Sequence, residues 1–142
     1  MRIIAIVLAA VLLAGCAGGR KDLTVNYHEK FEYAVEEGYE TVYRGLLADV
    51  RREYMTTTLG SHRVLENDLY PDSQCAMIRV AQINELFGEC LPARLDITGT
   101  TGNTCSIAAY SSKDGLSKSL TQRQFEGWLS WHGWPYSATR SN

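Results

Sequence analysis

The sequence FEYAVEEGYETVYRGLLADVRREY (residues 31–54) contains a change in hydrophobic period. Phe31, Tyr33 and Val35 alternate with more polar or smaller residues, a pattern typical of a half-buried strand. From residue 39 onward the apolar residues recur at spacings of three and four, which places them on one stripe of an amphipathic helix. The stripe comprises Tyr39, Val42, Tyr43, Leu46, Leu47, Val50 and Tyr54. We therefore predict a strand followed directly by a helix.

Three further strands are expected in the middle of the chain. Residues 76–83 (AMIRVAQI) are rich in β-branched residues, and residues 91–98 (LPARLDIT) alternate cleanly between apolar and polar side chains. Thr101-Gly102-Asn103 is typical of a turn, and residues 104–112 (TCSIAAYSS) continue as another strand. This pattern predicts an antiparallel meander.

A second helix is expected near the C-terminus. Residues 119–122 and 121–124 form overlapping capping boxes, which mark helix starts. Gly133 and Pro135 are expected to end this helix. Its predicted buried face comprises Phe125, Trp128, Leu129 and His132.

The element order is strand, helix, strands, helix. It predicts an α+β fold in which two amphipathic helices pack on one face of an antiparallel sheet. Residues 23–142 are long enough to form a single domain with its own core. The predicted architecture loosely resembles helix-grip and TATA-binding-protein-like domains, and a likeness of architecture implies nothing specific about function.

The N-terminus has the layout of a secretory signal peptide. Arg2 precedes an apolar run of about eleven residues, whereas a membrane-spanning helix needs roughly 20. Arg20, Lys21 and Asp22 then close the segment too early for a spanning helix.

Leu13-Ala14-Gly15-Cys16 resembles the lipobox of bacterial lipoproteins. The resemblance implies that residues 1–15 are removed, that the sulfur of Cys16 carries a diacylglycerol, and that residues 16–22 form a short linker. In such lipoproteins Ala17, rather than an aspartate, implies the outer membrane, with the domain on its periplasmic face. The alternative is an ordinary secreted protein in which Cys16 belongs to the discarded peptide.

Charge and composition exclude some partners. The net charge is −2, and no basic cluster exceeds two consecutive residues, so the sequence gives no indication of nucleic-acid binding. We find no internal repeat. The membrane, reached through the lipid anchor, and an envelope protein are the expected partners.

Three cysteines remain if Cys16 carries lipid. In the predicted meander Cys75 and Cys105 lie at one end of the sheet and Cys90 lies at the other, about 20 Å away. Cys75–Cys105 is therefore the only internal disulfide that we consider. The alternative is that all three cysteines are reduced and buried.

No signature of a catalytic, cofactor or metal site is present in the sequence. His28 and Glu32 are four residues apart, which on a strand is about 13 Å, too far to share one ion. A cysteine nucleophile with a histidine base remains possible through folding alone, and the Glu36-Glu37 pair is typical of a solvated corner. We therefore expect no cofactor, metal or catalytic residue.

Residues 128–136 (WLSWHGWPY) contain all three tryptophans. Trp131, Trp134 and Tyr136 are the candidate contact patch, because exposed aromatic rings favour protein interfaces, membrane interfaces and sugar faces. Core packing and helix capping are the structural alternative.

The sequence thus predicts a non-enzymatic outer-membrane lipoprotein that binds another envelope component. The alternatives are an envelope hydrolase with a cysteine or carboxylate site, and a lipid- or glycan-binding module that uses the tryptophans.

Overall fold

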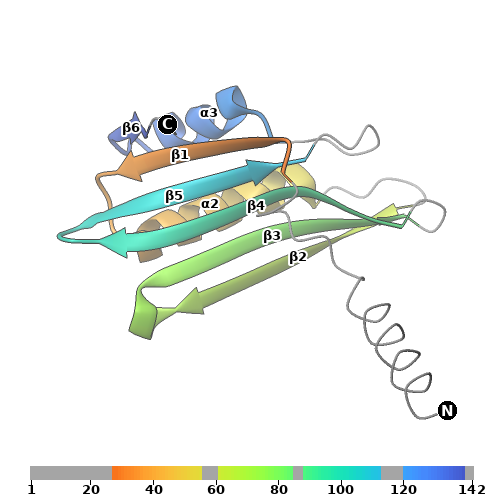
Figure 1. Ribbon diagram of the computed structural model, residues 1–142, viewed down its shortest axis with the longest axis horizontal. Coiled ribbons are helices and arrows are strands. Elements are labelled where there is room, and N and C mark those ends of the chain that lie inside the picture. Colours follow the sequence, from red (N-terminus) through yellow and green to blue (C-terminus); the bar gives the residue numbers. More distant parts are fainter. Residues whose placement is uncertain (1–26, 56–60, 85–87, 113–119, 140–142) are drawn as a thin grey trace, which may run out of the picture.

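The described residues form one antiparallel sheet with two helices packed on one of its faces (Figure 1). The computed structural model describes residues 27–55, 61–84, 88–112 and 120–139. The strand order is β2-β3-β4-β5-β1-β6. The elements are β1 (Glu29–Val35), α2 (Tyr39–Tyr54), β2 (Ser61–Tyr70), the short 3₁₀ helix η1 (Pro71–Ser73), β3 (Cys75–Asn84), β4 (Gly88–Thr100), β5 (Thr104–Ser111), α3 (Gln122–Trp131) and β6 (Tyr136–Ala138). The predicted α+β class is confirmed.

The change of period after β1 is reproduced in the structure. Phe31, Tyr33 and Val35 are buried beneath the helices, whereas Glu32 and Ala34 lie on the other face. Helix α2 covers the predicted range, and every residue of its apolar stripe is buried or packs against the core. The alternating strand and the amphipathic helix therefore cover each other.

The predicted meander is confirmed as β3, β4 and β5, with a β-bulge between Val80 and Gln82. Two strands have no counterpart in the sequence analysis. Strand β2 pairs with β3 along its whole length, and the three-residue β6 pairs with β1. On the helix-covered face of β2, Arg63 Nη1 donates to Tyr54 O at 2.7 Å and Asn67 Nδ2 donates to Tyr43 Oη at 2.7 Å. These bonds link β2 to α2.

Helix α3 begins and ends as expected. The Thr121 hydroxyl accepts a hydrogen bond from Gln124 N at 3.2 Å, which satisfies one of the free N–H groups of the first turn. Gly133 adopts a left-handed φ of 72°, and Trp134 N donates to Leu129 O at 3.3 Å. This geometry is that of a glycine-terminated helix.

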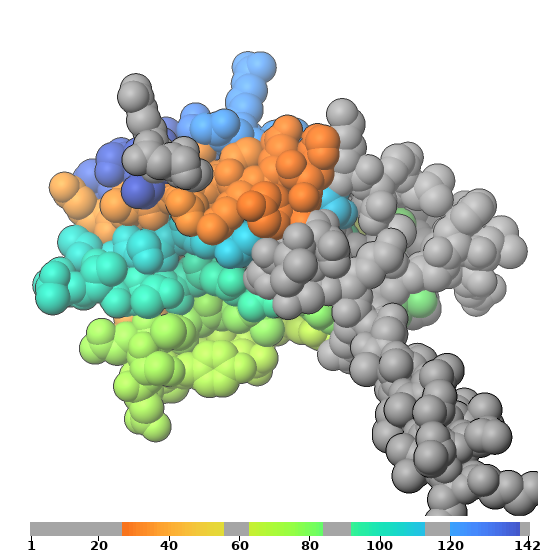
Figure 2. All heavy atoms as spheres, in the orientation of Figure 1, coloured from red at the N-terminus to blue at the C-terminus, as the bar shows by residue number. Residues whose placement is uncertain are grey.

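The other face of the sheet is not covered by either helix. In Figure 2 the strands lie side by side on this face, with α2 hidden behind them. The main core lies between the sheet and the two helices, where Tyr33, Leu46, Ile97 and Phe125 are all at most 1% exposed.

Residues 1–26 lie outside the described residues. The predicted signal peptide, the Leu13-Ala14-Gly15-Cys16 motif and the linker therefore stay predictions. Neither α2 nor α3, the two helices that the structure describes, is long and apolar enough to cross a membrane.

Candidate functional site

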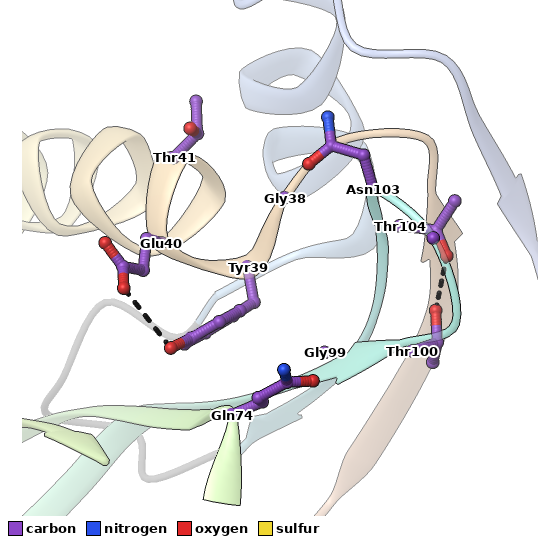
Figure 3. Close-up of a pocket in the computed structure, with 10 residues that line it drawn as sticks. Gly38, Tyr39, Glu40, Thr41, Gln74, Gly99, Thr100, Asn103 and Thr104 are labelled. Carbon is purple, nitrogen blue, oxygen red and sulfur yellow. Dashed lines mark hydrogen bonds between the residues drawn. The ribbon is translucent and has the colours of Figure 1, made fainter. Parts of the chain in front are cut away.

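A cavity of about 290 Å³ lies where α2 begins, beside the η1 turn and the β4–β5 turn (Figure 3). We call it the Tyr39 pocket, and its side-chain lining comprises Tyr39, Glu40, Gln74, Thr100, Asn103 and Thr104, with Thr41 at its edge. We call this end of the molecule, where β1 also ends at Val35, the distal end. The chain enters the sheet at the opposite end of β1.

Two glycines give the Tyr39 pocket its shape. A Cβ on Gly99 would come within 3.1 Å of both the Tyr39 ring and Gln74 Cβ, and a Cβ on Gly38 would come within 2.7 Å of Asn103 Oδ1. Larger residues at these positions would displace the side chains of the pocket.

Gln74 has an uncommon backbone conformation. Its φ of 51° and ψ of 43° are left-handed, and among the residues that the structure describes it is the only non-glycine with a positive φ. Its carbonyl accepts a 2.7 Å hydrogen bond from Gly99 N, which ties the η1 turn to β4. The surrounding structure therefore holds Gln74 in place at the pocket.

Hydrogen bonds also fix the opposite wall. Glu37 Oε1 accepts from Gly38 N at 2.8 Å and from Asn103 Nδ2 at 3.2 Å, which holds the asparagine against the start of α2. Tyr39 Oη donates to Glu40 Oε1 at 3.3 Å. Desolvation and the Glu40 carboxylate raise the pKa of Tyr39, so its hydroxyl is neutral at physiological pH.

A second cavity, of about 360 Å³, continues along the distal end between β1, β5 and β6. It shares Thr100 and Thr104 with the Tyr39 pocket and extends to Glu36, Cys105 and Tyr136. The distal end therefore carries two adjoining depressions.

The three residues of the predicted aromatic patch differ in their exposure to solvent. Trp131 is 79% exposed, the largest value among the large hydrophobic side chains described. Trp134 instead packs against the core and stacks on His132 at 4.1 Å between ring centroids. Tyr136 is 36% exposed and packs edge-on against Tyr33. Of the three residues of the predicted patch, only Trp131 and Tyr136 are therefore exposed.

Gly127 lies one helical turn before Trp131, and a Cβ at this position would meet nothing within 4 Å. A glycine inside a helix costs about 1 kcal/mol relative to alanine. No packing within the described structure requires this glycine, which lies beside the exposed Trp131.

A buried carboxylate that the sequence analysis missed joins the two helices. Asp49 on α2 is 1% exposed and lies 2.7 Å from His132 Nε2 and 2.7 Å from Arg52 Nη2. No hydroxyl or thiol of the described residues hydrogen-bonds to His132. The Asp49–His132 pair therefore fixes the end of α3 on α2.

The cysteines are reduced where the structure describes them. Cys75 and Cys105 are free thiols, and Cys105 is 1% exposed. Cys75 is aligned with Thr98 and Cys105 with Gly99, so β4 lies between the two cysteines and keeps them two strands apart. The described residues therefore contain no Cys75–Cys105 bridge, and of these two thiols only Cys105 is buried. Burial raises the pKa of the Cys105 thiol to about 11, which makes it a poor nucleophile.

The side chain of Cys90 lies outside the described residues. Its backbone is aligned with Gln82, far along β4 from Gly99, as expected for the opposite end of the sheet.

His28 and Glu32 do not form a joint site. Glu32 pairs with Lys30 at 2.8 Å, and His28 lies 4.0 Å from Glu29. No three His, Cys, Asp or Glu residues gather to hold a metal within the part of the chain that the structure describes.

Comparison of the chain with protein-family models, curated proteins and solved structures found no match. We therefore infer the function from the geometry.

Proposed function

We propose that this protein is an outer-membrane lipoprotein whose periplasmic domain binds another component of the cell envelope through the exposed aromatic rings of Trp131 and Tyr136. The observation that carries the proposal is the exposure of Trp131 beside the exposed Gly127. A large aromatic ring in water is unfavourable, and such rings are enriched where a partner covers them.

The position of the aromatic surface supports this proposal. Strand β1 is the first described strand after the predicted linker, and it carries the chain about 20 Å from Glu29 to Val35. Val35 is aligned with Tyr136 on β6, so this ring lies at the end of β1 away from the linker. A domain anchored through Cys16 would thus have Tyr136 at the end of β1 away from the attachment point.

We infer binding rather than catalysis from how the reactive groups are used. The Cys105 thiol is buried with a raised pKa, and the His132 ring is bonded to the Asp49 carboxylate. Both groups serve packing within the domain.

Photocrosslinking in living cells tests the binding role. A photoreactive phenylalanine analogue at position 131 should give a covalent adduct with an envelope protein or with the insoluble cell-wall glycan. The matched control is position 123, which is exposed two turns earlier on α3. Equal adducts from both positions, or none from position 131, would refute the proposal.

The anchor has a separate test. Cys16→Ala should release the protein from the membrane fraction, and mass spectrometry of the wild-type N-terminus should find an acylated Cys16. A wild-type N-terminus without acyl groups would refute the lipoprotein assignment while leaving the binding surface untested by this route.

A further inference from the structure

We propose that the Tyr39 pocket binds an uncharged sugar unit. This inference names a class of ligand for a pocket at the distal end. It rests on the proposed function in one respect, because the sugar would come from a polysaccharide of the cell envelope. The volume of about 290 Å³ lies at the small end of the usual range for ligand pockets, about 300–1,000 Å³. The pocket therefore suits one sugar-sized group.

The polar groups of the pocket match the hydroxyl groups of a sugar. The carboxamides of Gln74 and Asn103 and the threonine hydroxyls can each donate and accept hydrogen bonds, as a sugar hydroxyl does. The side chains of Gln74 and Thr41 have no hydrogen-bond partner within the described part of the chain. They are therefore available to a ligand.

The charge of the pocket favours a neutral ligand. None of its lining residues is a lysine, arginine or histidine, and Glu40 is the only ionisable group other than the Tyr39 phenol. A phosphate or carboxylate would have no cation to pair with and would meet the Glu40 carboxylate.

Tyr39 supplies the apolar surface that a sugar ring needs. Its ring is half-buried, and Figure 3 shows it between the start of α2 and the Gln74–Gly99 side of the pocket. Flat aromatic rings offer a face on which the C–H groups of a sugar ring can pack.

The left-handed backbone conformation of Gln74 indicates that its side chain contributes to binding. Glycine adopts this conformation without steric cost, whereas a residue with a Cβ is strained there. Strained residues that persist in a fold cluster at binding and active sites. Here the backbone of Gln74 is tied to Gly99, and its carboxamide lines the pocket.

The walls of the pocket are already fixed before a ligand binds. Gly99 lets the Tyr39 ring approach β4, and Glu37 holds Asn103. Binding then loses little side-chain entropy, which favours even a small ligand.

Isothermal titration calorimetry on the mature lipidated protein tests the proposal. The detergent should carry polyoxyethylene head groups, because maltoside head groups are themselves sugars. The probes are chitotriose and maltotriose, with sialyllactose as the anionic comparison. We expect saturable binding of at least one neutral probe, with a Kd of about 1 mM or lower (on the order of −4 kcal/mol), and at least tenfold weaker binding of sialyllactose.

Gln74→Gly separates a ligand role from a structural one. It removes the carboxamide and relieves the left-handed strain, so the thermal midpoint should stay unchanged or rise by about 2–4 °C. Binding should weaken at least tenfold. The matched control is Gln124→Ala, which removes a carboxamide from α3 outside the pocket and should leave binding unchanged.

Two results would overturn the proposal: neither neutral probe binds, or Gln74→Gly binds as the wild type does. If Gln74→Gly lowers the thermal midpoint, Asn103→Ala at an exposed position takes its place with the same expected loss of binding. Sugar binding without a crosslink from position 131 would refute the proposed function alone. A crosslink without sugar binding would refute only the assignment of this pocket.

Discussion

The two faces of the sheet differ in how their side chains are stabilised. The helix-covered face is mainly apolar, and nine of its residues on β3, β4 and β5 are at most 3% exposed. They comprise Ala76, Ile78, Val80, Ala93, Leu95, Ile97, Cys105, Ile107 and Ala109. The helix-free face instead carries ion pairs, which are Lys30–Glu32 at 2.8 Å, Arg94–Asp96 at 3.0 Å and Arg79–Glu66 at 3.0 Å. The apolar side chains of one face are buried by the helices, whereas the charged side chains of the other face pair with one another.

The register explains how the helix-free face neutralises its charge. Arg79, Arg94, Tyr110 and Lys30 are aligned across four neighbouring strands. The next row toward the distal end contains Asp96 and Glu32, two positions along from Arg94 and Lys30. Because cations and carboxylates occupy adjacent rows, β1 and β4 each pair their own charges, whereas Arg79 on β3 pairs with the aligned Glu66 on β2.

Adjacent residues on β4 test this difference most directly. Leu95→Ala should lower the free energy of unfolding by about 2–5 kcal/mol, because Leu95 is 1% exposed and its removal leaves a cavity. Arg94→Ala, on the other face, should cost no more than about 1 kcal/mol. Urea denaturation followed by circular dichroism measures both values. Equal costs would mean that the two faces do not differ as described.

The same difference explains which strands could be predicted from the sequence. Strands β1, β4 and β5 alternate between an apolar and a polar face, and α2 carries an uninterrupted apolar stripe. Strand β2 was missed because Arg63 and Asn67 occupy positions that face the helices. Their hydrogen-bond partners lie on α2, and a local pattern does not contain that information.

The candidate site was less predictable than the fold. The sequence proposed Trp131, Trp134 and Tyr136 together as an exposed patch, whereas Trp134 packs against the core. The sequence did not identify the Tyr39 pocket, which combines the start of α2, the η1 turn and the β4–β5 turn. The left-handed conformation of Gln74 has no signal in the sequence, because glutamine is not a residue that usually adopts it.

The helix layer contains one buried carboxylate, that of Asp49. Removing its hydrogen-bond partner His132 should have the next largest effect on the free energy of unfolding. His132→Ala should lower the free energy of unfolding by about 2–3 kcal/mol, because Asp49 would lose a hydrogen bond while remaining buried. Arg52→Ala is the matched control. The Arg52 side chain is 61% exposed, so its removal should cost at most about 1 kcal/mol. A larger loss from Arg52→Ala than from His132→Ala would contradict this assignment in a chemical denaturation experiment.

The burial of Cys105 on the helix-covered face should make the stability of the domain depend on pH. Burial raises its thiol pKa from 9.0 to about 11, so the folded state favours the neutral thiol. This contribution to stability is complete below pH 9 and is lost as the pH rises toward 11, with a total on the order of 2 kcal/mol. Urea denaturation of the wild type and of Cys105→Ala at pH 8 to 10 should therefore show a steeper decline for the wild type. Parallel declines would show that the thiol is not the titrating group.

The smallest effect on stability is expected where we place the partner. Trp131→Ala should change the free energy of unfolding by no more than about 0.5 kcal/mol, because the ring is 79% exposed. Trp128→Ala, three residues earlier on the same helix, should cost about 3–5 kcal/mol, because that ring is 7% exposed and contacts Phe125. Thermal and urea unfolding of both variants measure this contrast. If Trp131→Ala cost several kcal/mol, the ring would belong to the core, and α3 would lose the exposed surface from which we infer binding.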